Sequence, residues 1–295
     1  MTDGNRPIAP ADNASLPVLE SLLLRDRFLV IAGLLVVIAA AWTWILLGAG
    51  TGMSAPEGLS DTAGMPGMNG MSAMGSMAGM PSALALAVWT PSYAALILSM
   101  WWVMMIAMML PSAAPMLLLF ARLNRKERSG GRPYVPTAVF AGGYLSVWAG
   151  FSVAATALQW YLEHVGLLSS TMATSSSWLG AAVLIAAGAW QLTPIKSVCL
   201  RHCRSPLSFL LLSWRRGYPG AFRMGLGHGA YCLGCCWFLM SLLFFGGIMN
   251  LYWIIGLAIF VLIEKTMPTG QWFGRIIGIG LCAWGGLLIA TALQG

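Results

Sequence analysis

One short stretch near residue 230 carries four side chains that could bind a soft metal ion. His228, Cys232, Cys235 and Cys236 stand at positions i, i+4, i+7 and i+8 of an apolar segment. On an α-helix these spacings put the imidazole and the three thiols on one face. A single cysteine would carry no information, because it packs well in apolar surroundings. Four such groups on one stripe predict a metal site inside an apolar helix.

A second apolar segment, residues 100–116, is rich in thioethers. Its Met105, Met108 and Met109 fall on one face at 100° per residue. Methionine also fills gaps between packed helices, which is the structural alternative for such a stripe. The ligand chemistry favours a site in which these methionines face the cysteine helix, although no spacing in the sequence shows that the two helices are neighbours.

Two further groups lie outside these helices. Cys199, His202 and Cys203 form a cluster beside Arg201 and Arg204. Neighbouring guanidinium groups favour thiolate over thiol, so the cluster fits either a metal hand-off site or a thiol redox pair.

The other group is a low-complexity stretch with a methionine at every third position, namely Met65, Met68, Met71, Met74, Met77 and Met80. In an extended chain a period of three puts every thioether on one side, which predicts a capture site for soft metal. A flexible linker is the alternative.

The composition defines the elements that must position these residues. The chain of 295 residues is 58% hydrophobic and 8% charged, against about 25% charged residues in soluble domains. We therefore predict an all-α polytopic transmembrane helical bundle with about seven spans. No basic run suggests a nucleic-acid partner; the partner that this composition implies is the lipid bilayer.

The charges predict how the bundle is oriented. If the N-terminus is cytoplasmic, all 16 lysines and arginines lie on the cytoplasmic side, in the N-terminal arm, in loops or at helix ends, as the positive-inside rule expects. The expected parts are a cytoplasmic arm (1–27), a first transmembrane helix (28–47), a Met-rich periplasmic loop (48–92) and a six-helix metal-binding membrane domain (93–295). The expected spans of that domain are 93–121, 137–162, 178–195, 223–245, 251–263 and 273–293.

Acidic residues are few. Glu163 and His164 end the third span, and Glu264 and Lys265 end the sixth. We interpret both pairs as interfacial capping and pairing, with ion or proton handling as the alternative. The chain has no paired carboxylates placed for hydrolysis and no phosphate-binding loop, so ATP-driven transport by this chain alone has no support.

Four motifs resemble a known bacterial family of predicted metal-binding integral membrane proteins of unknown function. They are W-W-V-M-M-I-A-M-M-L-P-S-A-A-P-M (101–116), Q-L-T-P-I-K-S-V-C-L-R-H-C-R-S-P (191–206), G-L-G-H-G-A-Y-C-L-G-C-C-W (225–237) and E-K-T-M-P-T-G (264–270). The resemblance covers roughly residues 90–290. It implies a multi-span membrane fold and a metal role, and no particular activity.

Thioether and thiolate ligands together select Cu(I) over harder ions. The leading hypothesis is a Cu(I)-binding protein of a bacterial inner membrane, acting in copper acquisition or in delivery to a copper enzyme. Its partners would be copper, a copper chaperone or enzyme, or a larger membrane complex. Two alternatives stay open: a membrane thiol oxidoreductase component, which would use Cys232/Cys235 or Cys199/Cys203, and an accessory subunit in which the stripes and the patch Gly274-x-x-x-Gly278 only pack. The direction of transport stays open too.

Overall fold

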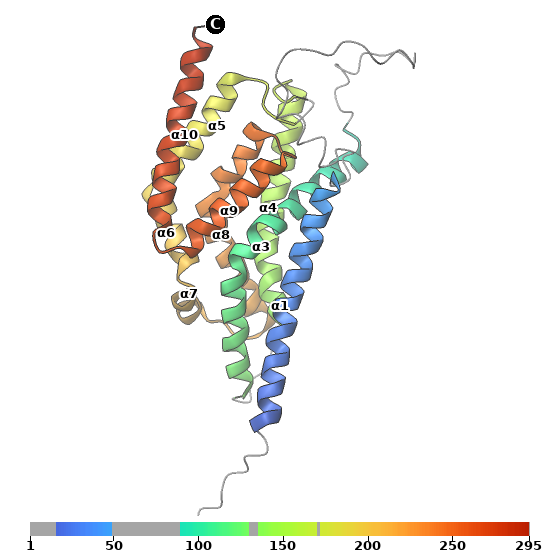
Figure 1. Cartoon of the computed structure of the whole chain (residues 1–295). Helices are drawn as coiled ribbons and strands as arrows, with labels where there is room; N and C mark the ends of the chain where they lie inside the picture. The colour runs from blue at the N-terminus through green and yellow to red at the C-terminus, as the bar shows by residue number, and fades with distance from the viewer. Residues whose placement is uncertain (1–15, 49–88, 130–134, 170–171, 295) are drawn as a thin grey trace, which may run out of the picture.

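The computed structural model describes residues 16–48, 89–129, 135–169 and 172–294 of the chain. Within these ranges the fold is entirely helical, and the only β pairing there is an isolated bridge between Leu168 and Thr174. Consecutive long helices run in alternating directions, and the C-terminal helix ends at the top of the view (Figure 1). The elements are α1 (Leu16–Leu46), α3 (Pro91–Ser129), α4 (Thr137–His164), α5 (Ser177–Leu192), α6 (Pro194–Arg204), α7 (Pro206–Ser213), α8 (Gly217–Gly246), α9 (Leu251–Thr266) and α10 (Gly270–Ala292).

The lengths and compositions of these helices fit a membrane protein. Among the described residues, α1, α3, α4, α8 and α10 are each long and apolar enough to cross a bilayer. The pair α5–α6 adds a sixth candidate if the two count as one span. Helix α9 is apolar but has only 16 residues, so it is short for the hydrocarbon thickness that a span must cover. The prediction of an all-helical fold is thus confirmed for the described residues, and their five or six candidate spans are compatible with a membrane protein.

The N-terminal helix is longer than expected. It begins at Leu16, inside the range 1–27 that was interpreted as a cytoplasmic arm. Residues 16–27 are rich in leucine and other good helix formers, which let the apolar helix continue toward the N-terminus. The repeated methionines from Met65 to Met80 lie outside the described residues.

The fourth span breaks where a loop was expected to begin. Helix α5 ends at Leu192, and α6 leaves it at an angle of 65°. The hydroxyl of Thr193 accepts a hydrogen bond from the backbone N–H of Lys196 at 3.3 Å, and Pro194 occupies the first turn. Both features are typical of a helix N-terminus, so the sequence T-P starts a new helix instead of a coil. The predicted basic loop therefore contains two further helices, α6 and α7.

Glycines allow α4 and α8 to pack closely. A Cβ atom on Gly225 would lie 2.1 Å from the carbonyl oxygen of Phe140, and one on Gly143 would lie 2.2 Å from that of Phe222. No side chain fits at either position, so the two backbones meet directly. This close crossing sets the spacing of the core in which the cysteines lie.

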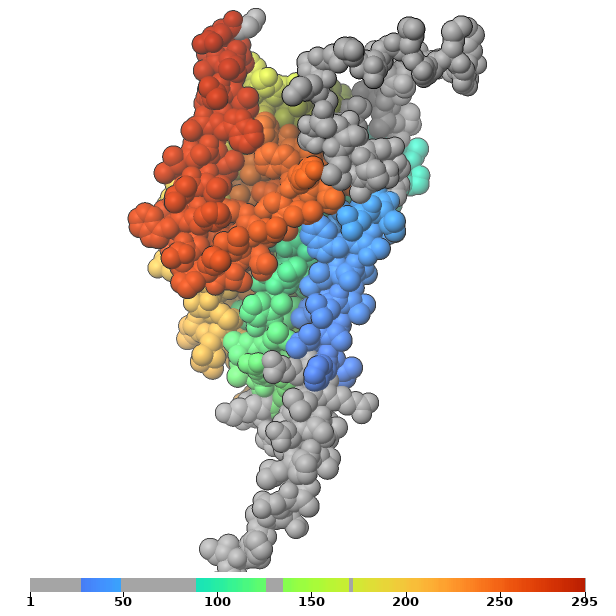
Figure 2. Space-filling view, in the orientation of Figure 1, coloured from blue at the N-terminus to red at the C-terminus, as the bar shows by residue number. Residues whose placement is uncertain are grey.

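The bundle has a buried centre and an apolar exterior. Figure 2 shows α9 on the visible face, lying between α10 on one side and α1 on the other. Large apolar side chains are exposed on the outer helices, among them Val36, Trp272 and Leu287. The inner helices α3 and α8 instead bury methionines, cysteines and aromatic residues. An apolar outside is what a lipid-facing bundle requires.

Candidate metal centre

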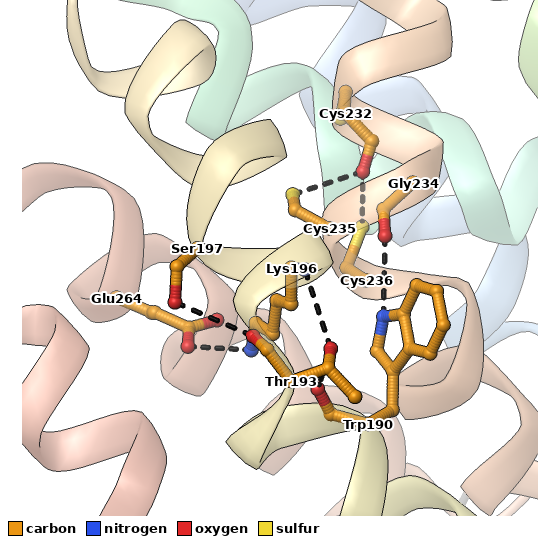
Figure 3. A network of polar contacts seen from close by, with 9 residues as sticks. All are labelled: Trp190, Thr193, Lys196, Ser197, Cys232, Gly234, Cys235, Cys236 and Glu264. Carbon is orange, nitrogen blue, oxygen red and sulfur yellow. Dashed lines mark hydrogen bonds and ion pairs between the residues drawn. The ribbon is translucent and has the colours of Figure 1, made fainter.

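Helix α8 places its three cysteines in the protein core. Cys232, Cys235 and Cys236 are each at most 1% exposed. The thiols of Cys235 and Cys236 donate to the carbonyl oxygen of Cys232 at 3.0 and 2.9 Å (Figure 3). All six cysteines of the chain are free thiols. The helical stripe predicted from their spacing thus faces inward, with its sulfur atoms close together.

The methionine helix reaches this stripe at one point. The Sδ atom of Met109 lies 3.9 Å from the Sγ atom of Cys236. A metal–sulfur bond of about 2.3 Å, the value for zinc and thiolate, puts two sulfur ligands about 3.8 Å apart in a tetrahedral site and about 4.0 Å apart in a trigonal one. The pair therefore has a spacing that a soft ion could bridge, as well as one typical of van der Waals contact. Met105 and Met108 are buried in the same core.

Four helices converge on the thiol of Cys232. The ammonium of Lys265, on α9, donates to Cys232 Sγ at 2.9 Å and to the hydroxyl of Ser112, on α3, at 3.3 Å. The hydroxyl of Tyr144, on α4, lies 3.1 Å from the same sulfur and donates to the Met109 carbonyl oxygen at 3.2 Å. Lys265 is only 8% exposed and forms no ion pair with a carboxylate among the described side chains. Its positive charge therefore faces sulfur.

The neighbouring glutamate is paired elsewhere. Glu264 accepts a hydrogen bond from the ammonium of Lys196, on α6, at 2.5 Å, and both side chains are almost fully buried (Figure 3). The pairing expected at this helix end thus joins Glu264 to Lys196, and Lys265 takes no part in it. Gly274 makes room for the carboxylate, because a Cβ there would lie 2.3 Å from Glu264 Oε1. The adjacent residues Glu264 and Lys265 thus have different partners, since Glu264 pairs with Lys196 and Lys265 contacts Cys232.

The bend at Thr193 brings α6 back against α8. The thiols of Cys203 and Cys235 are neighbours that interact electrostatically. Cys199 packs on Gly234, where an added Cβ would lie 3.0 Å from Cys199 Sγ. Trp190 donates from its indole to the Gly234 carbonyl at 3.2 Å, which ties the end of α5 to the same turn of α8.

The two predicted histidine ligands have aromatic neighbours. The exposed ring of His202 lies flat on Tyr231, with ring centres 4.2 Å apart, and its Nδ1 lies 2.9 Å from the Val198 carbonyl oxygen. His228 is 4% exposed and stacks on Tyr144 with centres 5.7 Å apart. Its Nδ1 atom has no hydrogen-bond partner in the described structure. That orphaned nitrogen sits one helical turn from Cys232 and is available to a ligand.

A sulfur line connects the core to the bent helix. We give this name to Met109, Cys236, Cys235 and Cys203, because each sulfur atom has the next one as a neighbour and the thiols of Cys235 and Cys236 share the Cys232 carbonyl as their acceptor. The line crosses from α3 through α8 to α6. Among the described residues, no three or more His, Cys, Asp or Glu side chains form a group that could hold a metal ion. The cysteines and histidines are therefore arranged as a succession of neighbours and not as one closed cage.

At the other end of the bundle, polar side chains lead toward the methionine helix. Glu163 accepts hydrogen bonds from the indole of Trp89 and the amide of Gln159, both at 2.8 Å. Gln159 is fully buried and accepts from the indole of Trp101 at 2.8 Å. His164 stacks instead on Trp160. Glu163 is thus the first member of a hydrogen-bonded chain that continues through Gln159 to Trp101 on the methionine helix.

The patch Gly274-x-x-x-Gly278 and the remaining cysteine, Cys282, make packing contacts within the chain. Gly274 and Gly278 pack closely against Glu264 and Gln191, and Cys282 lies against Gly188 where α5 meets α10. The glycine patch is therefore covered by the protein's own α5 and α9.

Comparison with known proteins adds one match. Residues 98–288 match the profile of the PpoB2 family, whose description is copper chaperone. The matched range begins just before the methionine stripe and includes every element of the sulfur line. Comparison with curated proteins and with solved structures found no match.

Proposed function

The chain belongs to the PpoB2 family of copper chaperones, and from this premise we propose that it binds Cu(I) inside a bacterial inner membrane. The bound copper would serve copper acquisition or delivery to a copper enzyme. The copper-related role follows from the family, and the long apolar helices support a membrane location. Thiolate and thioether ligands are those that Cu(I) prefers.

The sulfur line is the observation that carries this proposal. A soft ion can pass between neighbouring sulfur atoms by exchanging one ligand at a time, provided that each next sulfur is within reach. Met109 and Cys236 would hold copper in the core, and Cys235 would pass it to Cys203 on α6. Cu(I) is stable with few soft ligands, so a succession of sulfur pairs suits it better than it would suit zinc.

The remaining predicted ligands fit around this line. The orphaned Nδ1 of His228 would supply a further ligand next to Cys232. Cys199 and His202 lie on the same helix as Cys203, where copper would leave. The repeated methionines from Met65 to Met80 would capture the ion on the outer side, where thioethers have the advantage that they need no deprotonation.

Lys265 would balance the charge of bound copper. A Cu(I) ion held by two thiolates carries one net negative charge, which is costly in a low-dielectric core. The ammonium that touches Cys232 at 2.9 Å supplies the compensating positive charge. No carboxylate among the described residues is positioned to neutralise that ammonium, so it is available to the metal cluster.

The test is the Cu(I) stoichiometry and affinity of the purified protein under reducing conditions. The Cys232/Cys235/Cys236 triple serine variant should lose tight copper binding. Cys282→Ser is the matched control, because this thiol packs between α5 and α10, away from the sulfur line. Absence of tight binding in the unaltered protein would refute the proposal and favour an accessory subunit of a larger membrane complex. Equal loss in Cys282→Ser would show that cysteine replacement acts through stability.

One observation also favours a second function, that of a membrane thiol oxidoreductase component. Cys203 and Cys235 come from different helices and have neighbouring thiols, whereas cysteines on one helix need backbone distortion to form a disulfide. Thiol trapping in cells would distinguish the two functions. A Cys203–Cys235 disulfide that cycles during growth would support the oxidoreductase, and permanently reduced thiols would exclude it.

A further inference from the structure

A cleft lies between the α5–α6 bend and the start of α10. It has a volume of about 370 Å³, and its polar lining consists of Ser197, Arg201, Gln271 and Arg275. The two arginines come from different helices and border the same space. They lie at the end of the bundle where the bent helix and the first turns of α10 meet, which is the predicted cytoplasmic side.

The cleft has an excess of positive charge. Within the described structure, neither Arg201 nor Arg275 forms an ion pair or a side-chain hydrogen bond. Arg204, one turn further along α6, provides a contrast, because its guanidinium donates to the carbonyl oxygens of Met267 and Pro268. Arg275 instead lies over the ring of Trp272, 5.5 Å from its centre. Two guanidinium groups thus remain available to an anion.

We propose that this cleft binds the phosphate group of an anionic membrane phospholipid. Guanidinium groups bind phosphate through paired hydrogen bonds, and the Gln271 amide adds a neutral donor. Basic pockets between membrane helices on the cytoplasmic side are typical sites for anionic head groups. The cleft shares no residue with the sulfur line.

The apolar part of the cleft explains the choice of a lipid. Leu192 and Val198 line it and are 46% and 42% exposed. Trp272 is 67% exposed beside Arg275, and tryptophan is enriched at the membrane interface. A phospholipid would place its phosphate at the arginines and an acyl chain along the two aliphatic side chains. In doing so it would connect α6 to α10.

The experiment is native mass spectrometry of the full-length protein in neutral detergent with added phosphatidylglycerol or phosphatidylcholine. The unaltered protein should retain phosphatidylglycerol preferentially. Arg201→Ala/Arg275→Ala should weaken this retention by about thirty-fold, because each arginine near an anionic lipid surface contributes about five-fold. The control is Arg122→Ala/Arg223→Ala, which removes the same charge from two exposed residues outside the cleft.

Each outcome decides the proposal. Retention of phosphatidylglycerol by the Arg201/Arg275 variant, or equal loss in the control, would overturn it. If the alanine variant does not fold, Arg201→Lys/Arg275→Lys should still show intermediate retention, because lysine keeps the charge without paired hydrogen bonds. Titration with inorganic phosphate separates the two sources of this group. If inorganic phosphate does not displace phosphatidylglycerol, the result supports a lipid site. If inorganic phosphate displaces it fully, the cleft binds a free phosphate compound and the lipid proposal is refuted.

Discussion

Replacing Lys265 by methionine tests the chemistry of the core directly. Methionine keeps the length and apolar stem of the side chain and removes only the charge and the hydrogen bonds. In the described structure this ammonium contacts Cys232 Sγ at 2.9 Å and Ser112 Oγ at 3.3 Å, and no carboxylate pairs with it. We expect Lys265→Met to fold and to bind Cu(I) much more weakly.

The size of the effect follows from Coulomb's law. At an effective dielectric constant of about 20, two unit charges about 4 Å apart attract by about 4 kcal/mol. This energy corresponds to about a thousandfold change in a dissociation constant. Relaxation of the core around the missing charge would reduce the effect, so we expect a loss between about ten-fold and about a thousandfold.

The assay is competition for Cu(I) against a chromogenic chelator under anaerobic, reducing conditions. Lys265→Arg retains the charge and should stay within about ten-fold of the unaltered protein. Ser112→Ala removes one hydrogen bond to the ammonium without altering the charge, and its effect should be small as well. Binding by Lys265→Met within about three-fold of the unaltered protein would refute charge compensation by this residue.

Three further predictions concern packing and pairing. Gly225→Ala should lower the melting temperature, because its methyl group would lie 2.1 Å from a carbonyl oxygen and overpacking costs about 1–3 kcal/mol. The control Gly227→Ala, whose methyl group would have its nearest contact 3.7 Å away, should keep the melting temperature unchanged or raise it. An equal drop in melting temperature in both variants would contradict the close crossing of α4 and α8. Glu264→Gln should cost about 3–5 kcal/mol of stability, measured by thermal unfolding, because its lysine partner stays buried without a counter-charge; an unchanged melting temperature would mean that the pair is solvated. Mild oxidation with diamide, which takes up the two electrons and two protons released, should join Cys203 to Cys235, as peptide mapping would show; a bridge between two cysteines of α8 would contradict the described arrangement.

Local spacing was sufficient to predict the long apolar helices and the cysteine stripe, although it missed α6 and α7. An apolar segment of this length must satisfy its backbone internally, and the interval of four residues then puts Cys232 and Cys236 on one face. The methionine stripe was predicted in the same way. Its contact with the cysteines was a guess from ligand chemistry, and the structure places it at Met109.

The charged residues of the core could not be placed from spacing. Glu264 and Lys265 are adjacent in sequence at a helix end, where such pairs commonly cap or bridge. Their actual partners lie on other helices, since Lys196 is 68 residues from Glu264 and Cys232 is 33 residues from Lys265. Only the packing of α6 and α8 against α9 determines these contacts. The one sequence feature that could have indicated buried charges is that Glu264 and Lys265 end an apolar segment that has no other charged residue.

The unequal burial of the helices has a consequence for how this sequence can change over time. In the most apolar windows of α3 and α8, 56% and 50% of residues are buried in the protein, against 11% in α1 and 17% in α10. Most positions of the outer helices need only to stay apolar, so leucine, isoleucine and valine can replace one another there. In α3 and α8 a replacement changes a fitted contact, a glycine crossing or a sulfur neighbour. Among related chains we therefore expect substitutions to accumulate in α1 and α10, while the identities of the residues in α3 and α8 persist.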